Sequence, residues 1–277
     1  MIVVTGATGN VGRTLVRILA EQGREVTAVS RRMAQADAPS GVRAVAADLS
    51  QPHADVFAGA DAVFLLVGGE LMMVGDPVRV VAPLAAAGRI VLLSSQGVAT
   101  RPDSLSHGRA FAAYEQAVMD SGAEWAILRP GGFASNAYAW APSIKTSRTA
   151  AAPFGEVGLP VIDPDDIAAV AAVTLTRPGH AEAIYELTGP APITPRGRAA
   201  AIGDAIGEPV TFVDQTREEA RAQMLTFMPA PVADTTLDIL GTPTVREQTV
   251  SPDVEKILGR APGTFADWAR RNAAAFR

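Results

Sequence analysis

No cysteine occurs among the 277 residues of the chain. This absence excludes disulfide bonds, a catalytic thiolate and zinc sites built on thiolates. Histidine is also scarce, and His53, His107 and His180 lie far apart in the sequence. We therefore expect no bound metal ion.

The chain also lacks an excess of positive charge and a long apolar run. Its formal net charge is −5 without a strongly basic tail, which argues against a general nucleic-acid surface. The longest apolar stretch, near residues 80–93, is interrupted by Pro83 and Gly88, so no membrane span is expected. The first residues themselves read as a strand and not as a signal peptide. These features predict a soluble, cytoplasmic protein.

The opening stretch carries the strongest functional signal. Residues 2–5 are apolar and mostly β-branched, which favours a buried strand. Gly6, Gly9 and Gly12 follow at a spacing of three, and a helical pattern begins near Val11. Such a turn directs backbone N–H groups and the positive end of a helix dipole at one point, where a pyrophosphate binds well. A dinucleotide site is the prediction, and a structural turn without a ligand is the alternative.

Strands and helices then alternate regularly. Predicted strands cover residues 25–30, 42–47, 61–67, 90–93 and 124–128. This alternation predicts an α/β fold, a Rossmann-type doubly wound parallel sheet with helices on both faces. Ligands of such folds bind beyond the carboxyl ends of the strands, so the loop after each strand is a candidate for cofactor contact.

The loop after the second strand bears on the choice of cofactor. Folds that bind NAD usually place an acidic residue there, which holds the ribose 2′-hydroxyl. This chain has Ser30 followed by Arg31 and Arg32. An arginine at that point pairs with the 2′-phosphate of NADP, so we predict a preference for NADP(H) over NAD(H). The alternative is a pair of solvated surface arginines.

Three further strand ends complete the predicted cofactor site. Asp48, followed by Leu49, is placed to flank the adenine, or else to cap a turn. Val67 and Gly68 allow the backbone to approach the cofactor ribose, and Ser94 ends the fifth strand. The loop at 70–75, with Met72 and Met73, is predicted as an apolar lid or a simple loop.

The pattern loosens beyond residue 136. Residues 143–158 predict an irregular excursion, and Asp163, Asp165 and Asp166 predict the start of a helix rather than a cation site. A predicted helix at 217–228 is rich in methionine near its end, which suits either a core or a substrate pocket.

These patterns predict two parts of the chain. We expect an NADP-binding Rossmann domain over 1–136, rejoined by 159–190. A smaller C-terminal α/β lobe that binds the substrate is expected over 191–277. Helices on the surface of an α/β domain can pair without a sequence signature, so the sequence is also compatible with a homodimer.

Several motifs resemble the NmrA-like, atypical branch of the short-chain dehydrogenase/reductase superfamily. The matching stretches are 5–12 (TGATGNVG), 120–136 around Leu128–Gly131, 165–168 (DDIA), 185–189 (YELTG) and 260–265 (RAPGTF). The resemblance covers nearly the whole chain. It implies a Rossmann domain that binds NAD(P), mostly NADP, and a small lobe that closes a substrate cleft. Members include quinone and enone reductases, and also nucleotide-sensing regulators with little or no catalysis.

The resemblance also implies which residues hold the cofactor. Gly6, Thr8, Gly9, Asn10, Val11 and Gly12 would hold the pyrophosphate. The segment Pro130, Gly131, Gly132 and Phe133 would border the nicotinamide.

The catalytic positions depart from the superfamily pattern of serine, tyrosine and lysine. Tyr114 is followed four residues later by Val118 instead of lysine. Glu115 and Gly122 match a glutamate and a glycine that follow the tyrosine in extended members. Counted back from these two residues, the family's tyrosine position is occupied by His107 and its lysine position by Phe111. The family's serine position falls near Gln96.

This substitution favours a hydride acceptor over an alcohol. Without a lysine beside a phenol, the strong base that alcohol oxidation requires is missing. Histidine can donate a proton near neutral pH, and an amide can stabilise a developing oxyanion. The sequence thus predicts an NADPH-dependent reductase of a quinone-like or conjugated aromatic carbonyl compound, assisted by His107 and Gln96. A noncatalytic NADP(H) sensor and an NADP-dependent non-redox enzyme are the alternatives.

Overall fold

The computed structural model describes residues 1–51, 54–68, 71–72 and 75–277, and the chain divides into two compact units. The first unit comprises 1–130, 164–186 and 256–259, and the second comprises 131–163, 187–255 and 260–277. The boundaries expected from the sequence were 136, 159 and 190. The second unit thus takes in 131–136, 159–163 and 187–190, which we had grouped with the Rossmann domain.

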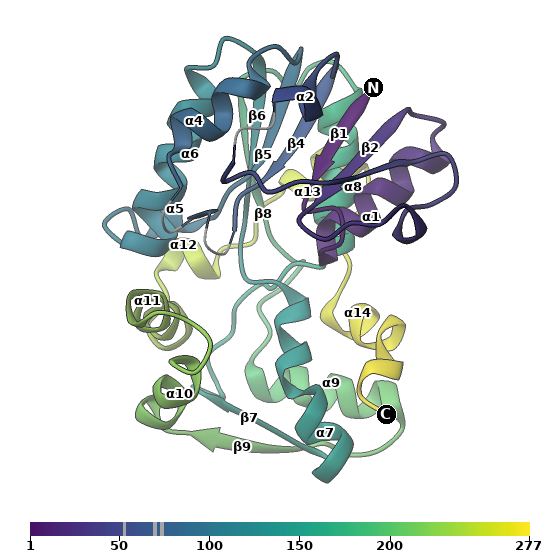
Figure 1. The fold of residues 1–277 in the computed structure, drawn as a ribbon. Helices are drawn as coiled ribbons and strands as arrows, with labels where there is room; N and C mark the ends of the chain where they lie inside the picture. The colour runs from purple at the N-terminus through teal and green to yellow at the C-terminus, as the bar shows by residue number, and fades with distance from the viewer. Residues whose placement is uncertain (52–53, 69–70, 73–74) are drawn as a thin grey trace. The chain divides into compact units, whose positions relative to one another are not determined.

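A seven-stranded sheet forms the centre of the first unit (Figure 1). Its strands are β1 (Ile2–Thr5), β2 (Val26–Ser30), β3 (Arg43–Ala46), β4 (Ala62–Leu66), β5 (Arg89–Leu93), β6 (Glu124–Pro130) and β8 (Ala183–Leu187). Their order is β3-β2-β1-β4-β5-β6-β8, and the five pairings from β3 to β6 are parallel. The chain winds outward in both directions from β1, so the point between β1 and β4 is the topological switch where ligands of such sheets bind.

Helices cover both faces of this sheet, as the doubly wound prediction requires. On one face α1 (Asn10–Glu21) packs against α8 (Pro164–Thr176), and on the other α4 (Pro77–Val81) packs against α6 (Ala110–Met119) (Figure 1). The short helices α2 (Ala54–Phe57) and α5 (Gly97–Thr100) and a π-helical turn at Leu105–Arg109 complete the unit. The predicted α/β fold is confirmed.

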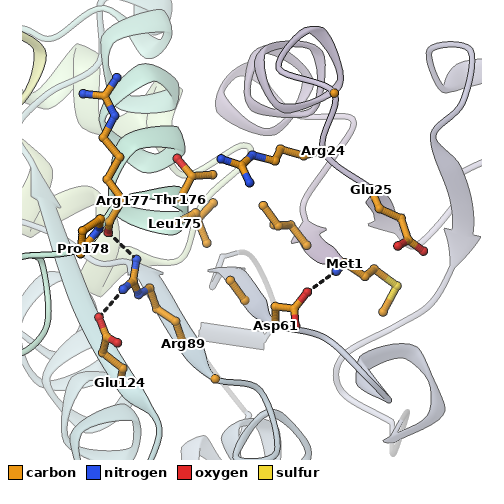
Figure 2. Close-up of a pocket in the computed structure, with 14 residues that line it drawn as sticks. Met1, Arg24, Glu25, Asp61, Arg89, Glu124, Leu175, Thr176, Arg177 and Pro178 are labelled. Atoms are coloured by element: carbon orange, nitrogen blue, oxygen red, sulfur yellow. Dashed lines mark hydrogen bonds and ion pairs between the residues drawn. The ribbon is translucent and has the colours of Figure 1, made fainter.

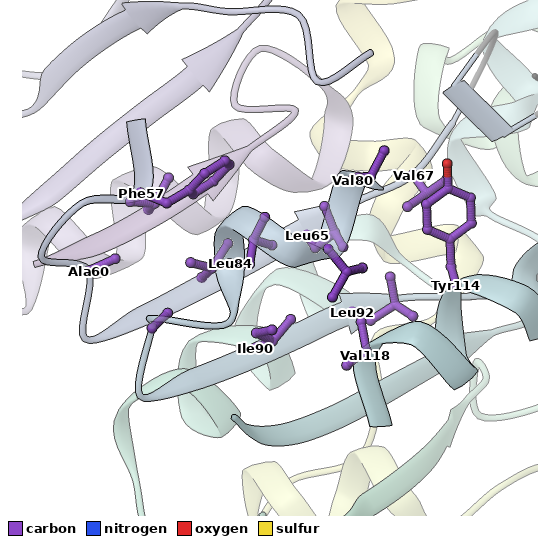
Figure 3. Close-up of a cluster of buried hydrophobic side chains, with 14 of the residues drawn as sticks. Phe57, Ala60, Leu65, Val67, Val80, Leu84, Ile90, Leu92, Tyr114 and Val118 are labelled. Atoms are coloured by element: carbon purple, nitrogen blue, oxygen red, sulfur yellow. The ribbon is translucent and has the colours of Figure 1, made fainter. Parts of the chain in front are cut away.

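A core of buried apolar side chains joins the sheet to the second helical layer. Leu65 of β4 and Leu92 of β5 meet Leu84 and Val118 in this cluster, which Figure 3 shows. Burial of these apolar side chains packs the helices against the sheet. This packing positions the ends of the strands.

The second unit has its own core. Strand β7 (Thr149–Pro153) pairs in parallel with β9 (Thr211–Gln215). The helices are α7 (Ala141–Ser147), α9 (Pro195–Ile206), α10 (Arg217–Met224), α11 (Ala230–Gly241), α12 (Val245–Gln248) and α14 (Phe265–Arg271), while α13 (Asp253–Leu258) spans the division between the units. Trp268 and Phe276 pack around Tyr138 at ring distances of 5.1 and 5.9 Å.

Two expectations for this unit were wrong. Residues 143–158 are not an irregular excursion, because they contain the end of α7 and strand β7, whose small side chains gain their order from pairing with β9. The helix expected over 217–228 ends at Met224, and Leu225 and Phe227 are 41% and 68% exposed. These two side chains are not core residues, and their role in a substrate pocket stays a prediction.

No helix within the described ranges is both long and apolar enough to cross a membrane.

Candidate functional site

The glycine-rich turn after β1 is shaped by two close backbone approaches. Gly6 has a φ of +64°, in the left-handed region that favours glycine. A Cβ atom on Gly12 would lie 2.2 Å from the carbonyl oxygen of Gly6, so only glycine fits at this first turn of α1. Val11 and Leu15 are buried and anchor the helix to the sheet. The turn is thereby held tightly against the end of β1.

The outer side of the same turn fits a pyrophosphate. Thr8, Gly9 and Asn10 are exposed. Gly9 is the N-cap of α1 and supplies no capping side chain, and the first turn of this helix contains no acidic residue. The positive end of the helix dipole and the backbone amides are left for an anion. The turn therefore has the steric and electrostatic features that a dinucleotide phosphate requires.

The neighbouring strand brings Arg31 to the same edge. The Ala7 amide donates to the Val29 carbonyl at 3.1 Å, which joins the glycine-rich turn to the end of β2. Arg31 and Arg32 follow this strand and are exposed. Neither forms an ion pair with a carboxylate in the part of the chain that the structure describes. Their charges are available to a phosphate group at this edge.

The structure places the other predicted cofactor residues of this unit at strand ends. Asp48 is exposed and its Oδ1 accepts from the Ser50 amide at 2.9 Å, so it does cap a turn. Leu49 beside it is partly buried. Val67 is buried directly after β4, and Gly68 next to it is exposed. Of the loop beyond, Gly69, Glu70 and Met73 lie outside the described residues, as does His53.

Ser94 is held in a buried polar network that the sequence reasoning missed. Its hydroxyl donates to the carboxylate of Glu115, and Arg129 contacts both oxygens of the same carboxylate, with Nε at 2.9 Å from Oε1. Glu115 is only 3% exposed. This network ties α6 to the ends of β5 and β6. A clue was present in the sequence, because a glutamate in an apolar helix needs a buried partner.

Gln96 and His107 lie close together at the end of β5. Gln96 is buried, and its backbone N–H donates to the Pro130 carbonyl at the end of β6 at 3.0 Å. A Cβ on the next residue, Gly97, would lie 2.7 Å from the Cβ of His107. The backbone of the Gln96–Gly97 segment thus rests directly on His107.

Two serine hydroxyls that the sequence did not indicate hold His107, one at its ring and one at its backbone N–H. Nδ1 lies 2.8 Å from the Oγ of Ser106, which is fully buried. The His107 amide donates to the Oγ of Ser104, the N-cap of the π-helical turn. When the Ser106 hydroxyl donates to Nδ1, the proton of a neutral imidazole is carried on Nε2.

Tyr114 is not placed to act as the catalytic phenol. Its ring is 1% exposed and its hydroxyl donates to the Leu71 carbonyl at 2.9 Å. Burial, with a smaller contribution from the charge of Asp76, raises the pKa of Tyr114 to about 12. A phenol with this pKa is a poor base near neutral pH.

The segment predicted to border the nicotinamide spans the division between the units. Pro130 ends β6 in the first unit, and Gly131, Gly132 and Phe133 belong to the second. There the Gly131 amide donates to the Leu187 carbonyl at 2.9 Å, and the Gly132 carbonyl accepts from the Ile162 amide at 2.8 Å. Backbone pairing holds this segment extended.

The three aspartates near the start of α8 have protein partners. Asp163 pairs with Arg271, and Asp165 accepts from the Thr14 hydroxyl at 2.8 Å. Within the described ranges, no cluster of three or more histidine, aspartate or glutamate side chains could hold a metal ion.

A cavity of about 530 Å³ lies at the opposite edge of the sheet, beside the amino ends of β1, β4, β5 and β6 (Figure 2). Arg89 at this edge pairs with Glu124 and donates to the carbonyls of Thr174 and Arg177, at 2.8 and 2.7 Å. These bonds close the carboxyl end of α8. The cavity is distant in the sheet from the glycine-rich turn and does not belong to the candidate site.

Comparison with known proteins places the chain among nucleotide-binding oxidoreductases. Residues 6–178 match the NAD(P)H-binding family. The (4-alkanoyl-5-oxo-2,5-dihydrofuran-3-yl)methyl phosphate reductase of Streptomyces griseus is 36% identical over 100% of this chain and 99% of its own length. The NAD(P)H azoreductase of Xenophilus azovorans is 34% identical, with the same two coverages.

Solved structures of the same fold include two reductases. The quinone oxidoreductase of Escherichia coli in complex with NADPH superposes with a TM-score of 0.79 at 24% identity, over 98% of this chain and 99% of its own. The triphenylmethane reductase of Citrobacter sp. in complex with NADP(H) also gives 0.79, at 20% identity over 99% and 100%. At these identities the likeness shows the fold.

Replacing Gly12 with alanine tests the glycine-rich turn. The added methyl group would displace the Gly6 carbonyl, and we expect NADPH to bind at least about tenfold more weakly. The measurement is a fluorescence titration of NADPH. Arg17→Ala, on the exposed side of the same helix, is the control and should bind normally. Unchanged NADPH affinity in Gly12→Ala would show that the turn does not hold the cofactor.

Proposed function

The chain belongs to the NAD(P)H-binding family of oxidoreductases, and we propose that it reduces a quinone or a conjugated carbonyl compound with NADPH. The observation that carries this proposal is the pairing of His107 with the Gln96–Gly97 segment at the carboxyl edge, while Tyr114 is withdrawn from it. The relatives support the substrate class. Their names describe an oxo-dihydrofuran phosphate, an azo compound and, in a solved structure of the same fold, a quinone.

The proposed roles follow from the chemistry of these acceptors. NADPH, when bound, supplies the hydride. Addition of a hydride to a quinone or an enone gives an anion that is already delocalised, so less proton assistance is needed than for a simple ketone. The side-chain amide of Gln96 would donate a hydrogen bond to the developing oxyanion. His107, oriented by Ser106, would deliver the proton.

Arg31 is the proposed determinant of cofactor choice. It lies beyond β2, next to the glycine-rich turn, and Ser30 stands where NAD-binding folds usually carry an acid. A guanidinium pairs well with the 2′-phosphate of NADPH and gains nothing comparable from NADH. Arg32 would add to the positive potential.

The first test is NADPH oxidation by the purified protein with a panel of quinones and enones, followed by absorbance. We expect saturable consumption that is faster with NADPH than with NADH. Tight NADPH binding without consumption across the panel would contradict the proposal and favour a nucleotide sensor or a non-redox enzyme.

Arg31→Ala should weaken NADPH binding roughly 10- to 100-fold, because one charge-assisted contact is lost. The affinity for NADH should change little. Both affinities are measured by fluorescence titration. Arg43→Ala is the matched control, because it removes an exposed arginine at the amino end of β3, away from the carboxyl edge of the sheet. Equal losses for the two nucleotides would refute the assignment of Arg31.

His107→Ala should slow quinone reduction by about 10- to 100-fold, near the lower end of the usual contribution of a general acid. NADPH affinity should be retained. Steady-state rates with an active quinone and a fluorescence titration of NADPH give the two readouts. Unaltered turnover would remove His107 from the mechanism.

A further inference from the structure

The second unit contains two arginines that stack on aromatic rings. In α9, the Arg196 guanidinium lies 4.8 Å from the centre of the Phe212 ring, and that of Arg198 lies 5.3 Å from the centre of the Trp140 ring. The two rings meet edge to face at 6.5 Å. The Trp140 indole donates to the Ala151 carbonyl of β7 at 2.9 Å, so its plane is fixed.

The two arginines differ in how their charge is neutralised. Arg196 pairs with Glu156 and with Asp214, each at 2.7 Å. For Arg198, no carboxylate in the described part of the chain lies within ion-pair distance, and its Nε is enclosed without a hydrogen-bond acceptor there. Burial lowers the pKa of the Arg198 guanidinium to about 10, so the group still carries its charge at neutral pH.

A partly buried charge without a counterion is unfavourable in a folded protein. A ligand of opposite charge can complete such a residue, and titratable groups perturbed by burial cluster at functional sites. A guanidinium that is stacked on an indole keeps its planar edge for two parallel hydrogen bonds, which suit a phosphate, a sulfonate or a carboxylate. The first turn of α9 contains no acidic residue that would compete with an anion.

We infer that Arg198 binds an anionic substituent of the substrate, so that the preferred acceptors carry a phosphate, sulfonate or carboxylate group. This inference rests on the proposed function. Trp140 ends the helical segment that starts at Ala134, directly after the segment proposed to border the nicotinamide. Arg198 and Phe133 are therefore parts of the same compact unit, the one expected to bind the substrate.

The test compares charged and neutral ligands in three proteins. The natural chain, Arg198→Met and Arg196→Met are each saturated with NADP and titrated by calorimetry with 1-naphthyl phosphate, 1-naphthol and inorganic phosphate. We expect Arg198→Met to weaken 1-naphthyl phosphate at least about tenfold and to leave 1-naphthol unchanged. Arg196→Met, whose arginine is already paired, should bind 1-naphthyl phosphate as the natural chain does.

Three results would overturn the inference. The first is that the natural chain binds 1-naphthyl phosphate no more tightly than 1-naphthol. The second is that Arg198→Met and Arg196→Met weaken the binding of 1-naphthyl phosphate equally. Inorganic phosphate that binds as tightly as 1-naphthyl phosphate would indicate a site for a free ion instead of a substrate group.

Thermal unfolding separates a ligand-binding role from a structural one. Because Arg198→Met removes an uncompensated charge, its Tm without ligand should be no lower than that of the natural chain. A clear fall in Tm, with unchanged affinity for 1-naphthyl phosphate, would mean that the arginine serves only to pack against Trp140. Arg198→Lys keeps the charge without the planar fork and should bind the phosphate with intermediate affinity.

Turnover distinguishes this inference from the proposed function. The ratio of kcat/KM for 1,4-naphthoquinone-2-sulfonate to that for 1,4-naphthoquinone should fall at least about tenfold in Arg198→Met. Turnover of both quinones with an unchanged ratio would refute the role of Arg198 alone. If neither quinone is reduced but 1-naphthyl phosphate still binds through Arg198, the reductase proposal fails and the anion site stands.

Discussion

The close approach of Gly12 to the carbonyl oxygen of Gly6 is the constraint on which the candidate site depends. It presses the first turn of α1 against the end of β1, at the point where the sheet order reverses. The side-chain hydroxyl of Thr5 reinforces this point, since it donates to the Phe64 carbonyl and accepts from the Leu66 amide of β4. Parallel pairing then brings the ends of β2, β5 and β6 to the same edge. This steric contact therefore sets the position of the turn that is proposed to hold the phosphate.

Several arginines of this protein are neutralised by carboxylates of the chain itself. Arg129 is completed by the buried carboxylate of Glu115, and Arg196 by Glu156 and Asp214. Arg31 and Arg198 have no carboxylate within ion-pair distance among the described residues. Arg31 is exposed beside the glycine-rich turn, where a nucleotide phosphate is the natural partner. Arg198 is partly buried in the second unit, where the proposed counterion is an anionic group of the substrate. The two positions suit two different anionic groups.

Local signals made much of the fold predictable. Helix α9 shows such signals, because Thr194 caps it, Pro195 begins it and Gly207 ends it in the left-handed conformation. Strand β7 could not be foreseen, since its alanines acquire order only from β9, far along the chain. The same limit applied to the candidate site. The glycine-rich turn is a contiguous motif, whereas the contact of Arg198 with Trp140 and the bond of Ser94 to Glu115 join residues that are remote in sequence.

The most direct measurement follows deuterium in NADPH that is labelled separately at each face of nicotinamide C4. An active acceptor from the quinone and enone panel is reduced, and the NADP that forms is analysed by mass spectrometry. If the glycine-rich turn and the ends of β5 and β6 hold the cofactor in one orientation for hydride transfer, one labelled form should lose its deuterium and the other should retain it. Loss from both forms alike, or no NADP formation despite tight binding, would contradict hydride transfer at this edge of the sheet.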